Sequence, residues 1–87
     1  MATVRIPLLL KEVTGGARQA EVVGDTISEI IDALDAVHPG IKSRLRDGDG
    51  LTTSITFAVD GRLAAQGLST PVAPDSEVSL LPTFGGG

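Results

Sequence analysis

The residues of this sequence that are best suited to chemistry are three consecutive glycines, Gly85, Gly86 and Gly87. Glycine has no Cβ atom, so such a segment can thread a narrow channel and adopt positive φ angles. We expect Gly87 to end the native chain, which would make its carboxylate an unhindered group that can enter the active site of another protein. The alternative is that the glycines are a cloning remnant or a frayed end without a function.

A carboxylate is a poor acyl donor, so the group on Gly87 needs activation. ATP can adenylate it with release of pyrophosphate, and a persulfide sulfur can then attack the acyl-adenylate to leave a thiocarboxylate. Neither step requires a catalytic side chain on the protein that bears the carboxylate. The composition agrees with this role, because the chain has no cysteine and its one histidine, His38, has no recognisable catalytic triad around it.

Other candidate sites have simpler interpretations. Asp47 and Asp49 resemble the start of a calcium loop, but Leu51 occupies the third ligand position and no glutamate follows at the twelfth, so we interpret them as a solvated turn. The remaining glycines match neither a phosphate-binding loop nor a dinucleotide fingerprint. Three acidic residues are interpreted as the solvated face of a helix, with docking of a partner as the alternative: Glu29, Asp32 and Asp35.

Length and composition restrict the class of protein. The 87 residues form one small domain, and its 41% hydrophobic content, with only Phe57 and Phe84 as aromatics, predicts an aliphatic core. A net charge of −4 and so few aromatics argue against binding to nucleic acid or to an anionic membrane, and favour a partner with a basic surface. We find no signal peptide or membrane-spanning run, and the lack of disulfides fits a cytoplasmic protein.

Hydrophobic periodicity predicts a strand pair, a helix and further strands. Alternation over residues 3–10 and 18–23, joined by a Gly15-Gly16 turn, indicates a hairpin, although Pro7 cannot donate to a ladder. Thr26 and Glu29 form a capping box at the start of a helix over residues 27–37. The remaining predicted elements are a helical turn over 41–45, a loop over 47–50, a strand over 55–59, an Asp60-Gly61 hairpin to a strand at 62–63, a loop or short helical turn over 68–74, and a strand over 77–81.

This order of elements predicts an α+β fold of the β-grasp, or ubiquitin-like, type. A mixed sheet of four to five strands would wrap over one main helix, and the last strand would lie parallel to the first in the middle of the sheet. We expect this domain to cover residues 1–82 and a flexible glycine tail to cover residues 83–87.

The last strand positions the candidate chemistry. If Val78 and Leu80 face the helix, alternation places Leu81 on the opposite face of the sheet. Pro82 is expected to stop the ladder, so Phe84 lies in a segment that has left the sheet. Leu81 and Phe84 would then form an apolar docking patch beside the tail. The alternative is that Phe84 folds back and caps the core.

The sequence resembles a known family, the MoaD/ThiS-type sulfur carriers. The most specific element is the segment from Glu77 to Gly87, an apolar strand followed by a proline, a few residues and a terminal Gly-Gly. The resemblance covers the whole chain and is greatest to CysO-type carriers and to relatives used in natural-product sulfur incorporation. Weaker elements contribute: Ile6-Pro7, Thr14-Gly15-Gly16, Gly24-Asp25-Thr26 and Asp60-Gly61.

The resemblance implies a protein cosubstrate and not an enzyme. An E1-like, MoeB/ThiF-type partner would use ATP to adenylate Gly87, with Gly86 as its diglycine neighbour, and the carrier itself would bind no cofactor. The resulting thiocarboxylate would donate sulfur to a biosynthetic synthase. Leu81 matches a position that contacts the activating enzyme in relatives, and we place it with Pro82 and Phe84 in the partner-binding surface. Gly85 departs from the family, which often has another residue there.

The sequence leaves three further functions open. The chain could be a ubiquitin-like modifier that is conjugated to target lysines, or the small subunit of a molybdopterin synthase. It could also be an interaction domain with an artefactual tail. The sequence does not identify the final sulfur acceptor among cysteine precursors, thiazole, molybdopterin, a thiosugar and tRNA.

Overall fold

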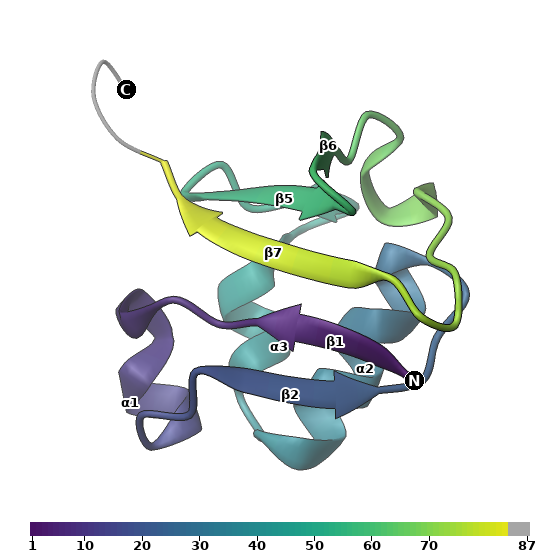
Figure 1. Cartoon of the computed structure of the whole chain (residues 1–87). Helices are drawn as coiled ribbons and strands as arrows, with labels where there is room; N and C mark the ends of the chain where they lie inside the picture. The colour runs from purple at the N-terminus through teal and green to yellow at the C-terminus, as the bar shows by residue number, and fades with distance from the viewer. Residues whose placement is uncertain (84–87) are drawn as a thin grey trace.

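The structure is a computed structural model, and it describes residues 1–83. In this part of the chain, helices α2 and α3 lie behind a five-stranded mixed sheet with the strand order β2-β1-β7-β5-β6 (Figure 1). This is the predicted β-grasp fold. The elements in chain order are β1 (Ala2–Arg5), the 3-10 turn η1 (Leu8–Leu10), α1 (Lys11–Thr14), β2 (Gln19–Val22), α2 (Ile27–Val37), α3 (Ile41–Leu45), β3 (Arg46–Asp47), β4 (Gly50–Leu51), β5 (Ile55–Val59), β6 (Arg62–Leu63), the 3-10 turn η2 (Gly67–Ser69) and β7 (Glu77–Pro82).

The last strand, β7, is the centre of the sheet, as predicted. β1 lies parallel to it with Val4 opposite Val78, and β5 lies antiparallel on its other side with Phe57 opposite Leu80. All four of these side chains are buried. Because β1 and β7 run in the same direction, the N-terminus and the end of β7 lie at opposite ends of the sheet (Figure 1). We call the end at which β1 and β7 stop the exit end, and the other the far end.

The core fills the space between the sheet and α2. The apolar face of α2 consists of Ile27, Ile30, Ile31 and Leu34, each at most 1% exposed. Burial of an aliphatic side chain of this size contributes about 1.5–3 kcal/mol to stability. The predicted helical periodicity is therefore confirmed.

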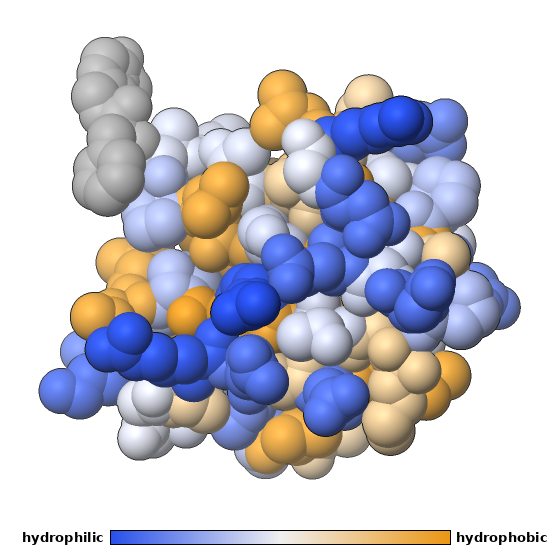
Figure 2. Space-filling view, viewed as in Figure 1, coloured by the Kyte–Doolittle hydropathy of each residue, from blue (hydrophilic) through white to orange (hydrophobic). Residues whose placement is uncertain are grey.

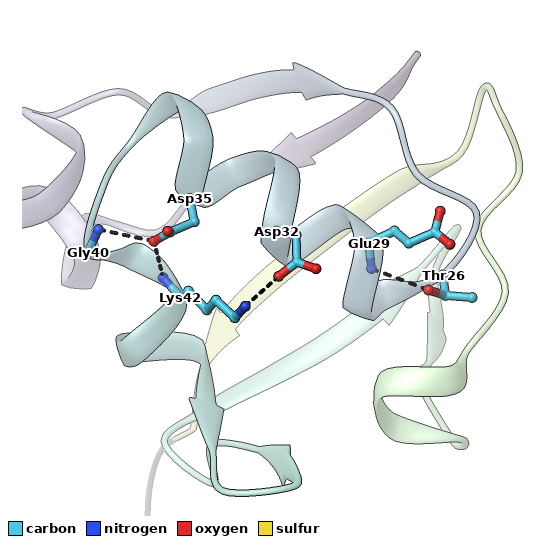
Figure 3. Close-up of polar contacts among 6 residues, drawn as sticks. All are labelled: Thr26, Glu29, Asp32, Asp35, Gly40 and Lys42. Carbon is cyan, nitrogen blue, oxygen red and sulfur yellow. Dashed lines mark hydrogen bonds and ion pairs between the residues drawn. The ribbon is translucent and has the colours of Figure 1, made fainter.

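Hydrogen bonds at the start of α2 confirm the predicted capping box. The Thr26 hydroxyl accepts from the Glu29 N–H at 3.2 Å (Figure 3). The Glu29 carboxylate turns back and accepts from the N–H of Asp25 at 2.9 Å. The two side chains together satisfy donors that have no partner inside the helix, and thereby define its first residue.

The acidic stripe of α2 is used within the fold. One oxygen of Asp35 accepts from the backbone N–H groups of Gly40 and Lys42, both at 3.1 Å, and so holds the start of α3. The ammonium group of Lys42 lies 2.8 Å from Asp32, and this hydrogen bond lowers the pKa of Asp32 below its usual value (Figure 3). With Glu29 at the cap, each carboxylate of the stripe bonds within its own chain, which favours the structural interpretation over docking.

The predicted strand over residues 3–10 is wrong beyond Arg5. Pro7 has no N–H to donate, and the chain leaves the sheet there and forms η1, in which Leu10 N–H donates to the Pro7 carbonyl at 3.1 Å. A helical turn, α1, follows and ends at Gly15, whose φ of +68° favours glycine. The connection to β2 is therefore longer and more structured than the predicted Gly15-Gly16 turn.

The predicted loop over residues 47–50 is a short hairpin. Arg46 in β3 pairs with Leu51 in β4, and Gly48 turns the chain between them with a φ of +65°. The sequence indicated only the turn. Each of the two strands is two residues long, too short to show the alternation that identifies a strand. η2 confirms the short helical turn that was one of the two options for residues 68–74.

Asp60 connects the β5–β6 hairpin to the start of β7. It occupies the predicted two-residue turn with a φ of +51°. Its carboxylate accepts from the N–H of Glu77 at 2.9 Å and from the hydroxyl of Ser76 at 2.8 Å. These bonds stabilise the ionised carboxylate and lower the pKa of Asp60.

We predict that Gly24→Ala destabilises the fold. A Cβ atom at this position would lie 2.9 Å from the backbone nitrogen of Ile30, closer than real contacts allow. The helix would have to move, at a cost of about 1–3 kcal/mol. Urea unfolding measures this loss. Gly50→Ala is the control, since its Cβ would meet nothing within 4 Å; an equal loss for both variants would contradict the packing argument.

We predict that Asp60→Asn removes part of the pH dependence of stability. Folding lowers the pKa of Asp60, so its bonds contribute fully above the unfolded-state pKa of about 3.9 and are lost as the pH falls through the lower folded-state pKa. Wild type should therefore exceed the variant in unfolding free energy at neutral pH, and the difference should vanish in strong acid.

Urea unfolding at a series of pH values measures this difference. Asparagine tolerates the positive φ of the turn, so the backbone geometry is retained. Asp49→Asn, in the β3–β4 turn, is the control, because the Asp49 side chain forms no hydrogen bond or ion pair with the other described residues. A difference between wild type and Asp60→Asn that stays constant down to strong acid would disprove the role of the charge.

Candidate functional site

The end of β7 holds the root of the predicted tail. Within β7, Leu81 lies opposite Thr56 and Pro82 lies opposite Ile55. Beyond the strand, the N–H of Thr83 donates to the carbonyl of Ser54 at 3.0 Å, and the hydroxyls of Thr83 and Thr56 lie 3.1 Å apart. The chain is therefore hydrogen-bonded to its neighbour up to the last described residue.

Pro82 does not stop the ladder, which corrects the prediction. Successive N–H groups of a strand alternate between its two sides. Since the N–H of Thr83 points to β5, the N–H that Pro82 lacks would point to the other side. There the pairing with β1 has already ended, at Arg5 opposite Ser79. The proline therefore costs the sheet no hydrogen bond.

Leu81 lies on the solvent-facing side of the sheet, as predicted. Its neighbours Val78 and Leu80 are 0% and 2% exposed, whereas Leu81 is 50% exposed. Figure 2 shows the face of the sheet that is turned away from α2, with a hydrophobic area over the second half of β7 among mostly polar surroundings. A large apolar side chain in that setting is available to a partner.

Four predicted site residues, Phe84, Gly85, Gly86 and Gly87, lie outside the described residues. Their roles in docking and in carrying the reactive carboxylate stay predictions, as does the boundary between a domain at 1–82 and a tail at 83–87. The structure describes the site up to Thr83, including two of the three residues assigned to the partner-binding surface, Leu81 and Pro82.

Sequence reasoning missed two exposed leucines at the exit end. Leu8 is 63% exposed and Leu9 is 48% exposed, both in η1, while Leu10 beside them is buried. The interpretation of this segment as a strand hid Leu8, because alternation would have buried it, and it gave Leu9 no role. Three consecutive leucines after a proline were the available signal, since such a run fits no half-buried strand.

The described body of the protein shows no conventional catalytic site. His38 follows the last residue of α2, and its backbone N–H donates to the carbonyl of Leu34 at 2.7 Å. Residues 1–83 contain no group of three side chains able to hold a metal ion. Nor does any helix within this range have the length and hydropathy needed to cross a membrane. A hollow of about 660 Å³ lies at the far end, and the carboxylate that lines it is that of Asp60, which accepts hydrogen bonds from Ser76 and Glu77.

Comparison with known proteins agrees with this arrangement. Residues 4–87 match the ThiS family. The chain is 35% identical to the sulfur carrier protein CysO of Mycobacterium tuberculosis over 98% of its own length and 97% of that protein. It is 37% identical to small archaeal modifier protein 1 of Haloferax volcanii, covering 90% of this chain and 91% of that one.

A solved structure is similar over the whole chain. A chain in the crystal structure of the BexX/CysO complex of Amycolatopsis orientalis superposes with a TM-score of 0.91 and 35% sequence identity, with full coverage of both chains. The sheet order, the buried side of β7 and these matches lead to one conclusion. The chain belongs to the ThiS family of ubiquitin-like sulfur carriers.

Proposed function

We propose that this sulfur carrier, a cosubstrate and not an enzyme, bears its sulfur on the carboxylate of Gly87. The carboxylate attacks the α-phosphate of ATP, and pyrophosphate leaves. The terminal sulfur of a persulfide then attacks the acyl carbon and displaces AMP. A thiol cleaves the resulting sulfur–sulfur bond, which leaves a thiocarboxylate on the carrier and a disulfide on the donor side.

The observation that carries this proposal is the hydrogen bond that fixes Thr83, the residue from which the tail starts, to Ser54. Thr83 is bound to Ser54 at the exit end, so the following residues start from a defined position at the edge of the body. Four residues span at most about 14 Å when extended. That length lets Gly87 reach an active site on another protein while the body stays outside it.

A sulfur carrier needs an enzyme that activates it and a protein that accepts its sulfur. We propose an E1-like enzyme of the MoeB/ThiF type as the first, and a biosynthetic synthase as the second. ATP belongs to the activating enzyme, so the carrier needs no cofactor of its own. Leu81 and Pro82, with Phe84 beyond them, form the proposed contact surface.

The names of two relatives support a proposal for the receiving pathway. The mycobacterial relative is named for its role as a sulfur carrier, and the Amycolatopsis relative occurs in a complex with BexX. We propose that this chain likewise delivers sulfur to a synthase that makes cysteine, a cofactor or a sulfur-containing natural product. A synthase bound to the carrier would identify the product directly.

A second function, conjugation to proteins, is favoured by one observation. The chain is 37% identical to an archaeal protein named as a modifier. Both functions share the adenylation step, and they differ in the nucleophile that follows, a persulfide or the amine of a lysine. Recovery of peptides joined to Gly87 through a lysine isopeptide bond would support modification.

We predict that the chain gains mass when incubated with ATP, the activating enzyme and a sulfur source. The gain should equal the replacement of one oxygen atom by sulfur, as measured on the intact protein. A variant that lacks Gly86 and Gly87 should bind the enzyme but gain nothing. If wild type shows neither this gain nor release of pyrophosphate, the proposed function is wrong.

We predict that Leu81→Ser weakens binding to the activating enzyme about tenfold with little change in stability, because half of this side chain already faces solvent. Calorimetric titration measures the affinity. Leu63→Ser is the matched control, since Leu63 is 72% exposed on the same side of the sheet near the far end. Equal weakening by both variants would argue against a local contact at Leu81.

A further inference from the structure

A hollow of about 320 Å³ lies at the exit end, between η1, α3 and the start of β5. Leu10 and Ile55 line it and are buried, while Leu9 and Arg44 line it and reach solvent. Ser54 also lines it, and the carbonyl of Ser54 is the group that accepts from Thr83. The hollow therefore adjoins the root of the tail.

The apolar part of this site consists of leucine side chains that are largely outside the core. Leu9 is 48% exposed, and its neighbour Leu8 is 63% exposed. Figure 2 shows hydrophobic surface over the segment that follows β1, close to the exit end. Covering such side chains with a partner removes apolar surface from water, which favours association.

The polar part of the site is a cation with a weak partner. Among the described residues, Arg44 pairs only with Glu12, at 3.9 Å, and the Glu12 side chain is 87% exposed. Such a pair contributes little in water. The contrast is Lys42, whose ammonium group lies 2.8 Å from Asp32. The guanidinium of Arg44 therefore keeps N–H donors for a carboxylate from outside.

Charge is distributed unevenly between the two ends of the sheet. Lys11 and Arg18 lie in the connection from β1 to β2, so they accompany Arg44 at the exit end, whereas the guanidinium of Arg5 pairs with Glu77 at 3.2 Å. At the far end, acidic residues outnumber the basic Arg62: Glu21, Asp25, Asp60 and Asp75. The net charge of −4, from which we expected a partner with a basic surface, therefore does not describe the exit end.

We propose that this hollow docks a segment of the activating enzyme in which a carboxylate side chain lies beside an apolar one. The carboxylate accepts from the guanidinium of Arg44, and the apolar side chain covers Leu9 above the buried floor. An acidic rim on the enzyme also steers the basic exit end toward it. This inference rests on the proposed function, and it places a second contact beside the solvent-facing side of the sheet that carries Leu81.

The test measures the affinity of the full-length chain for the activating enzyme at low and at high ionic strength. Arg44→Glu should weaken binding about tenfold at low salt and less at high salt, because salt screens charges. Arg62→Glu, the same change near the far end, should stay within about twofold. Leu9→Ser should weaken binding about fivefold at either salt concentration, because it removes an apolar contact. Its control is Val23→Ser, since Val23 is an exposed valine near the far end, and this variant should bind like wild type.

Urea unfolding of each variant separates lost binding from lost folding. If wild type forms the thiocarboxylate but Arg44→Glu and Arg62→Glu bind alike, the docking site is wrong and the proposed function stands. If the enzyme neither binds nor adenylates wild type, the docking site and the proposed function are both wrong. If Arg44→Glu alters the sedimentation of the chain alone, the hollow contacts a second copy and the inference is overturned.

Discussion

The parallel pairing of the first and last strands is the constraint on which the rest of this structure depends. Val4 and Val78 lie opposite each other with no exposed surface, so a shift of one residue would turn a buried face to solvent. Parallel strands require a long crossover, which here contains α2 and covers the sheet. The same pairing sends the N-terminus and the exit of β7 to opposite ends.

Four carboxylates of the body bond within the fold. Glu29, Asp35 and Asp60 bond to backbone N–H groups, and Asp32 pairs with Lys42. The exposed leucines and Arg44 at the exit end are the features from which we infer contacts with a partner.

Much of the fold could be predicted, because its main elements carry strong local signals. The apolar spacing of α2, its cap at Thr26 and the Asp60-Gly61 turn all depend on neighbours in sequence. The segment after Arg5 was predicted wrongly, because Ile6, Leu8 and Leu10 continue the alternation of the strand in sequence. In the structure Pro7 lacks the N–H of a ladder, and the turn η1 buries Leu10 while Leu8 and Leu9 stay exposed. For the site, the sequence predicted the exposed side chain of Leu81, but not Leu8 and Leu9 in η1.

The sequence by itself determined the glycine run, the alternation that turns Leu81 outward and the absence of cysteine chemistry. These are properties of single residues and of their immediate spacing. Only the tertiary structure decided that Thr83 bonds to Ser54 and that Arg44 and Leu9 line the same hollow. Such juxtapositions depend on strand order and register, which are set by burial over the whole sheet and not by any local pattern.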